Sequence, residues 1–497
     1  MRLFIWIAVV LPFLVHAQTT TKIQLHIDNA NVDKVYFLKN DYAKPSVLFG
    51  ERLVYIPLED GELTWQDQIS KPLFINAGYR DSSTNESFTY SFYVSPGDSL
   101  EVSFDAENPD STIVVQGKGY RNNQPLLQKV LSNRESYETY QKDSLPYNVL
   151  EAIKLTNAGN KKLVKEYNEK YNPDQSLVEV TDLYVEYFPL WTYLTFSGAQ
   201  KFYAGEAFKR NESKWQAITD SLTRKLPMNN AALFDIPNYV YFLPLHLIRL
   251  KEYVWSHNDL LPYYYDTATQ EEALKLYNND RENVLREKII NKHFEGRTAE
   301  FLYATLFKSA IDDKEDSLPE IYSRFVKKYP NSAYIPYIEP AIKEIEAKRA
   351  RKLTDKMQII ENADAYTTFD EVLELAKGKT VLLDMWGTWC GPCRKEFSLN
   401  SEAIKKHFKD RDLEYLYIAN LDIENEKKWK ELIAYYKLEG THILASAELT
   451  ENIMEILDRT SYPTYAILKK DGTFELSKAG YPMNREVLFD QIEKALK

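Results

Sequence analysis

The chain reads VLLDMWGTWCGPCRKEF from Val381 to Phe397, and this stretch contains its only two cysteines, Cys390 and Cys393. An apolar run typical of a β-strand precedes the cysteines, and a stretch that favours a helix follows them. The first cysteine then stands at a helix N-terminus, where unpaired N–H groups and the helix dipole favour a thiolate. Pro392 suits the first helical turn, because its missing N–H would have no partner there. The stretch predicts a strand–loop–helix unit that carries a dithiol.

The spacing of the cysteines predicts thiol–disulfide exchange. Cys390 would attack a disulfide of a substrate, and Cys393 would resolve the mixed disulfide, leaving a redox-active Cys390–Cys393 disulfide and a reduced substrate. Asp384 lies in the apolar run, six residues before Cys390. Burial there would raise the pKa of its carboxyl group, which suits it to accept the proton of Cys393. A solvated carboxylate at the strand end is the other interpretation of Asp384.

Two other uses of the cysteine pair compete with redox chemistry. A static cross-link between adjacent turns would remove little entropy from the unfolded chain. A zinc site would need further ligands, but the chain has no other cysteine and its histidines are scattered. The motif, the strand before it and a later proline together favour a redox site, and no metal or cofactor is expected.

The pattern Asp-x-Trp-x-x-Trp-Cys-Gly-Pro-Cys, from Asp384 to Cys393, resembles the thioredoxin superfamily. In that family a proline before a later strand is cis and faces the cysteines, and Pro463 matches it. The backbone of Tyr462 would pair with a bound substrate chain. A trans turn proline is the other interpretation of Pro463. The resemblance implies a substrate-binding surface of five residues: Trp389, Gly391, Pro392, Tyr462 and Pro463.

Within the superfamily the chain resembles the extracytoplasmic TlpA/ResA-like thiol–disulfide reductases. The resemblance rests on Arg394-Lys395-Glu396 after the motif and on a long insertion over residues 420–462. It covers residues 357–497 and implies an α/β thioredoxin-like fold there. Those proteins usually carry a proline where this chain has Phe397. The Gly-Pro spacer favours reduction over oxidation, because oxidants and isomerases of the superfamily usually have a histidine there.

Residues 1–17 have the marks of a secretory signal peptide, with Arg2, an apolar run over Leu3–Val15 and a small residue, Ala17, at the expected cleavage site. The run is too short for a stable membrane anchor. No other stretch approaches a transmembrane length, so no transmembrane segment is expected in the mature chain. In an oxidising compartment, a chain whose only two cysteines form no structural disulfide is expected to use them for redox chemistry. The expected location is the periplasm.

The 497 residues, 44% of them hydrophobic, can support several domains. Residues 18–119 alternate with period two and predict a β-sandwich, whereas 120–356 have helical periodicity and predict an all-α region and linker. Glu271–Ile290 is one example of this helical periodicity. The tyrosines of this region could line a peptide or glycan groove or simply pack the helices: Tyr184, Tyr187, Tyr193, Tyr203, Tyr239, Tyr241, Tyr263, Tyr264 and Tyr265.

The net charge of −11 argues against nucleic acid as the main partner. The leading hypothesis is an exported thiol–disulfide oxidoreductase that reduces protein disulfides. Its partners would be a disulfide-bearing protein substrate and a membrane-bound or soluble thiol electron donor. A disulfide isomerase is one alternative, and a non-catalytic binding or redox-sensing module is another.

Overall fold

A computed structural model gives the structure of the protein. It describes residues 20–39, 41, 43–50, 53–81, 87–131, 143–236, 239–280, 282–311, 317–361 and 366–497. The expected signal peptide, residues 1–17, lies outside the described residues. The chain forms two compact units, the first ending at Thr305 and the second beginning at Leu306. Among the described helices, none combines the length and the apolar character needed to cross a membrane.

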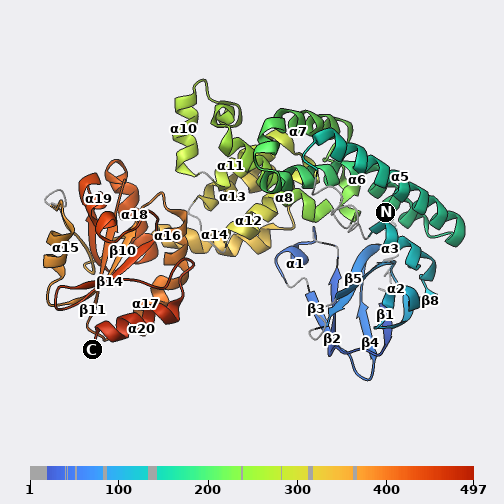
Figure 1. Cartoon of the computed structure of the whole chain (residues 1–497), viewed down its shortest axis with the longest axis horizontal. Helices are drawn as coiled ribbons and strands as arrows, with labels where there is room; N and C mark the ends of the chain where they lie inside the picture. Colours follow the sequence, from blue (N-terminus) through green and yellow to red (C-terminus); the bar gives the residue numbers. More distant parts are fainter. Residues whose placement is uncertain are drawn as a thin grey trace, which may run out of the picture. The chain divides into compact units, whose positions relative to one another are not determined.

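The first unit begins with a β-sandwich (Figure 1). Its strands are β1 Thr21–Asp28, β2 Lys34–Lys39, β3 Leu53–Pro57, β4 Glu62–Asp67, β5 Leu73–Arg80, β6 Ser87–Val94, β7 Ser99–Asp105 and β8 Val114–Lys118. They form two four-stranded sheets, in the orders β4–β1–β7–β8 and β3–β2–β5–β6. Ile23 and Leu100 of one sheet share a core with Phe37 and Phe92 of the other. The alternating pattern is therefore confirmed as a sandwich, because each strand turns one apolar face inward.

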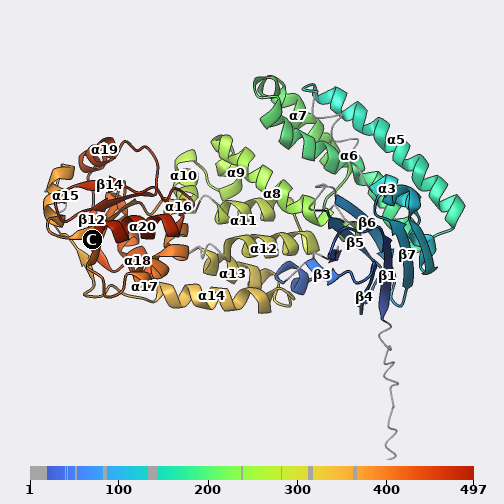
Figure 2. The ribbon, with the colours of Figure 1, turned by 60° about the horizontal axis from the view of Figure 1, so that its bottom comes forward.

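Helices follow the sandwich. They are α3 Pro125–Leu131, α5 Pro146–Tyr171, α6 Gln175–Tyr203, α7 Glu206–Lys225, α8 Tyr239–Ser256, α9 Leu261–Tyr265, α10 Gln270–Asn279, α11 Asn283–His293 and α12 Gly296–Ile311; two short helices, α1 Pro45–Leu48 and α2 Pro109–Thr112, lie within the sandwich region. Figure 2 shows α5, α6 and α7 side by side, and each contacts the other two. Six of the tyrosines named above are buried, which supports helix packing as their role: Tyr184, Tyr187, Tyr193, Tyr239, Tyr264 and Tyr265.

The stretch Glu271–Ile290, which has helical periodicity, is interrupted once. The structure has two helices there, with α10 ending at Asn279 and α11 beginning at Asn283. The carboxylate of Asp280 accepts a hydrogen bond from the backbone N–H of Asn283 at 2.7 Å. This bond satisfies a backbone N–H at the start of α11, which allows the chain to begin a new helix there and not to continue α10.

The second unit contains helices α13 Leu318–Lys328 and α14 Ile335–Arg349, followed by a six-stranded mixed sheet. The strands are β9 Met357–Ile359, β10 Thr380–Trp386, β11 Leu413–Ala419, β12 Gly440–Leu444, β13 Thr464–Leu468 and β14 Phe474–Leu476, in the order β14–β13–β10–β11–β12–β9. β10, β11, β12 and β9 are parallel, β13 pairs antiparallel with β10, and β14 pairs antiparallel with β13. This confirms the predicted α/β thioredoxin-like fold.

Helices cover both faces of this sheet. They are α15 Phe369–Ala376, α16 Gly391–Glu396, α17 Glu402–His407, α18 Glu426–Tyr436, α19 Ala447–Ile456 and α20 Arg485–Ala495. Every residue of β10 is buried, so the strand is central. Leu383 and Met385 of β10 pack against α15 and α19, whereas Leu382 and Trp386 lie in clusters with α16, α17, α18 and α20. The residues at positions 382, 384 and 386 therefore share the face that carries the cysteines.

We propose residues 357–497 as the redox domain and expect that fragment to fold and to reduce a small disulfide. A longer fragment from Leu318 should be more stable by about 1–3 kcal/mol, measured by denaturant unfolding. The reason is that α14 packs against α18 and that the Arg351 guanidinium donates to the Tyr435 carbonyl at 2.6 Å. An unfolded or inert 357–497 fragment would contradict this boundary.

Candidate active site

The two cysteines lie where β10 ends and α16 begins. Gly387–Trp389 forms the connecting loop, Cys390 is the N-cap of α16, and Pro392 occupies its first turn. The cysteines form a disulfide with their Cα atoms 5.3 Å apart. Cys390 is 3% exposed and Cys393 is fully buried. The structure thus brings together the predicted pair, with Cys390 the slightly more exposed of the two residues.

The start of α16 provides donors for a charged sulfur. The backbone N–H of Cys393 donates to the Cys390 Sγ at 3.1 Å. A π-helical turn over Phe397–Ser401 joins α16 directly to α17, so helical backbone continues from Gly391 to His407. Hydrogen bonds and the dipole of such a helix stabilise a thiolate at its N-terminus in the reduced form.

Asp384 is buried in the sheet below the cysteine-bearing helix. It is 5% exposed, which rules out the solvated interpretation. Burial, followed by the nearby Glu396 carboxylate, raises the pKa of Asp384 well above its ordinary value. Its Oδ1 atom has no hydrogen-bond partner within the described part of the chain. A cavity of about 20 Å³ lies beside it, with Glu396 and Tyr417 among its lining residues. That volume accommodates about one water molecule.

Glu396 is a residue of this site that the motif alone does not reveal. It lies on α16, three residues after Cys393, and is 2% exposed. Its carboxylate accepts hydrogen bonds from the Met483 backbone N–H at 3.1 Å and from the Asn400 side chain. The available signal was its spacing, because residues three apart on a helix share one face. An acidic residue at that spacing from a buried cysteine faces the core.

The predicted substrate-binding residues flank the disulfide. The Tyr462–Pro463 peptide bond is cis, as expected. Trp389 is 49% exposed, and its ring lies edge-on to the Tyr462 ring with the centroids 5.5 Å apart. The Trp389 indole N–H donates to the Asn420 carbonyl at 3.1 Å. Gly387 lies against this indole, where a Cβ atom would come within 2.4 Å of the ring nitrogen. The tryptophan is therefore held against the loop, with about half of its surface exposed.

The loop before the cysteines is tied to Asp422, which follows β11. Asp422 is fully buried and accepts hydrogen bonds from the Thr388 backbone N–H at 2.6 Å and from the Thr388 hydroxyl at 2.5 Å. Burial raises the pKa of Asp422, and the two bonds from Thr388 oppose that rise. The sequence offered no local signal for this contact, because the residues are 34 positions apart.

Thr388→Val should lower the free energy of unfolding by about 1–3 kcal/mol, because a buried carboxylate loses a hydroxyl donor. Thr388→Ser keeps the hydroxyl and is the matched control, expected to remain within about 1 kcal/mol of the natural chain. Denaturant unfolding of the oxidised protein measures both. Equal values for the two variants would show that the hydroxyl contributes nothing.

A dithiol at the start of a helix, a buried carboxylate in the strand before it and a cis proline opposite define a thioredoxin-like domain. Residues 378–474 match the family described as thioredoxin-like. The chain is 32% identical over 124 residues to the thiol–disulfide oxidoreductase ResA of Bacillus thuringiensis, covering 24% of this chain and 68% of that protein. It belongs to this family of ResA-like thiol–disulfide oxidoreductases.

Two further proteins show similarity to part of the chain. ResA of Bacillus subtilis is 27% identical over 100 residues, which is 19% of this chain, and the chain spans only half the length of that relative. The solved thioredoxin domain of a thiol–disulfide oxidoreductase from Bacteroides vulgatus is 22% identical, with a TM-score of 0.22, covering 25% of this chain and 84% of that structure.

Proposed function

We propose that the protein reduces disulfides of protein substrates through Cys390 and Cys393. The observation that supports this most is the Cys390–Cys393 disulfide at the start of α16, above a buried Asp384 with a raised pKa. Strongly shifted carboxyl groups beside a reactive pair are typical of catalytic sites. If the disulfide only stabilised the fold, burying the Asp384 carboxyl group near it would cost free energy without any benefit.

In the proposed reaction the reduced protein meets a substrate disulfide. The Cys390 thiolate attacks one substrate sulfur, an S–S bond forms between them, and the other substrate sulfur leaves as a thiolate that takes up a proton. Cys393 then loses its proton and attacks the Cys390 sulfur. The mixed disulfide breaks, the second substrate thiol is released, and the protein is left oxidised. Two electrons have passed to the substrate, so a thiol donor must reduce the protein again.

Asp384 is the proposed acceptor of the Cys393 proton. A carboxylate with an ordinary pKa is a weak base at neutral pH, whereas a raised pKa matches it better to a thiol. Asp384 lies on the sheet face that carries the cysteines, and the cavity beside it has room for about one water molecule. Its carboxyl would return that proton to solvent or to the leaving thiolate.

Reduction is favoured over oxidation or isomerisation by the Gly391-Pro392 spacer. A spacer without a basic side chain adds no positive charge to stabilise the thiolate, so the dithiol remains a better reductant. The test is turnover of insulin disulfides by the full chain with dithiothreitol as donor. Refolding of scrambled ribonuclease in the same preparation measures isomerase activity. Failure to reduce insulin or any small disulfide would leave the redox-sensing module as the better hypothesis.

Export to the periplasm is the second part of the proposal. The support is the sequence of residues 1–17 and the use of both cysteines in one redox pair, as expected of a chain that works in an oxidising space. Its partners there would be disulfide-bearing proteins and a soluble or membrane-bound thiol donor. N-terminal sequencing of protein from a periplasmic extract should start just after Ala17, and an uncleaved cytoplasmic product would contradict export.

A further inference from the structure

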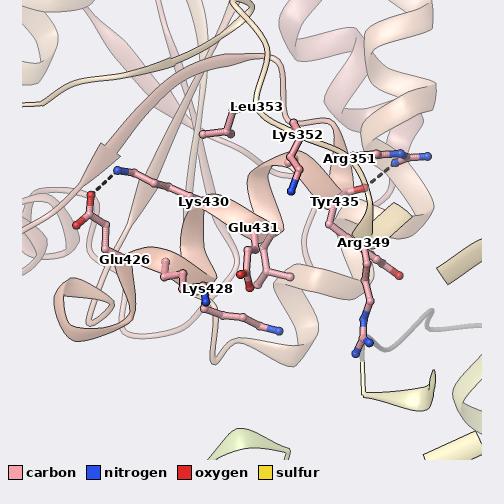
Figure 3. Close-up of a pocket in the computed structure, with 12 residues that line it drawn as sticks. Arg349, Arg351, Lys352, Leu353, Glu426, Lys428, Lys430, Glu431 and Tyr435 are labelled. Carbon is pink, nitrogen blue, oxygen red and sulfur yellow. Dashed lines mark hydrogen bonds and ion pairs between the residues drawn. The ribbon is translucent and has the colours of Figure 1, made fainter. Parts of the chain in front are cut away.

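A cleft of about 890 Å³ lies in the second unit, between the outer face of α18 and the segment that follows α14 (Figure 3). Two carboxylates line it, Glu426 and Glu431, against six cationic side chains. The cations are Arg349, Arg351, Lys352, Lys427, Lys428 and Lys430. The whole chain has the opposite balance, with 73 acidic and 62 basic residues. The cleft is therefore a local concentration of positive charge on an acidic protein.

Some of these cations already have partners. The Arg349 guanidinium binds the Glu320 carboxylate through two hydrogen bonds of 2.6 and 2.8 Å, and the Lys430 ammonium pairs with Glu426 at 2.6 Å. Arg351 donates its hydrogen bond to the Tyr435 carbonyl, a neutral group that does not balance the charge of the guanidinium.

Two lysines complete the positive lining. Within the described residues, Lys352 and Lys427 form no ion pair, and both are exposed. Figure 3 shows Lys352 extending from the segment after α14 toward α18. Arg351, Lys352 and Lys427 together place three positive charges on the two opposite walls of the cleft. A ligand lying along the cleft would meet cations on both sides.

We propose that this cleft binds an acidic segment of the protein that exchanges disulfides with Cys390. The proposal rests on the proposed function and names the chemistry of the partner. The volume is large enough for several residues of a peptide, since pockets of about 300–1,000 Å³ hold drug-sized ligands. Leu353, which is 38% exposed, supplies apolar surface for the stem of a glutamate side chain. Opposite charge would also speed the encounter of the two proteins.

The position of the cleft suits a partner of the dithiol. The inner face of α18 carries Trp429 and Ile433, which share a core cluster with Cys390 and Cys393. An α-helix with its side chains is about 10–12 Å across. A segment held on the outer face of α18 is thus separated from the cysteine cluster by one helix. Holding a partner there raises the effective concentration of its disulfide at the active site.

The test uses the full chain and a fluorescein-labelled peptide rich in glutamate, with fluorescence anisotropy as the readout. Lys352→Glu/Lys427→Glu should weaken binding by at least about tenfold, and added salt should weaken it in the natural chain. The matched control is Lys406→Glu/Lys409→Glu, which makes the same change of charge at two exposed lysines, one in the last turn of α17 and one just after it. Its affinity should remain within about twofold of the natural chain.

Several outcomes would overturn the proposal. They are equal binding by the two double variants, equal binding of a peptide with glutamine in place of glutamate, and binding of inorganic pyrophosphate without binding of the peptide. Turnover of a small disulfide by Lys352→Glu/Lys427→Glu should be unchanged, because neither lysine belongs to the dithiol site. Peptide binding by a protein that reduces no disulfide would refute the proposed function and leave the acidic-segment site standing.

Discussion

Cys390→Ser is expected to abolish disulfide reduction, lowering turnover by at least about a thousandfold, because the attacking sulfur is lost. Cys393→Ser should also stop turnover, but only after one attack. In that variant Cys390 forms a mixed disulfide with the substrate and nothing resolves it. The expected asymmetry rests on the N-cap position of Cys390 on α16 and on the complete burial of Cys393.

The measurement is turnover of insulin disulfides, followed by intact-mass spectrometry of each variant after exposure to substrate. Cys393→Ser should carry the mass of one covalently attached substrate chain, which dithiothreitol releases. Cys390→Ser should carry none, because the remaining thiol lies below the surface. Equal residual turnover, or equal trapping by both variants, would contradict the assignment of roles. Trapping from a periplasmic extract would also identify natural partners.

The sequence predicted those parts of the site that depend on neighbouring residues. The run before the cysteines, apolar except for Asp384, predicts a buried strand, and the cysteines that follow it stand at a helix start, so the place of Cys390 could be predicted locally. The same run favoured a buried Asp384 but left a solvated carboxylate at the strand end open. The β-sandwich was also predictable, because alternation fixes which side chains face inward.

The remaining features depend on contacts between distant segments. Thr388 meets Asp422 only because β10 and β11 are parallel neighbours, which brings their following loops together. The Asp384 cavity is closed by Glu396 and by Tyr465, from α16 and β13. The cleft described above forms where the segment after α14 passes α18. Taken alone, the sequence of each segment predicts only a solvated charged surface. Sites of this kind can be recognised only when the fold is known.

Asp384→Asn should slow resolution by Cys393 by about a hundredfold or more near neutral pH, while initial attack by Cys390 changes little. The amide cannot accept the Cys393 proton, so resolution must await a pH at which the thiol ionises unaided. Rapid mixing with a disulfide substrate separates the two steps. In the variant, the rate of resolution should continue to rise with pH beyond the point at which it levels off in the natural protein.

The same change should stabilise the oxidised fold at neutral pH. Below about pH 4, an aspartate is protonated in the folded and the unfolded chain, and its burial has no pH-dependent cost. As the pH rises, the unfolded chain releases its proton first, because burial holds the pKa of Asp384 high in the folded protein. The free energy of unfolding therefore falls between those two pKa values, by about 1.4 kcal/mol for each unit that separates them. The asparagine variant should lack this fall.

Glu396→Gln provides an independent test of the charge at this site. The Glu396 carboxylate contributes to the raised pKa of Asp384, so its replacement should lower that pKa and move the levelling of the resolution rate to lower pH. Asp384→Asn and Glu396→Gln should then shift the pH profile in opposite directions. A shift in the same direction, or unfolding curves with the same pH dependence as the natural chain, would mean that Asp384 is a buried structural carboxyl and that another group accepts the proton of Cys393.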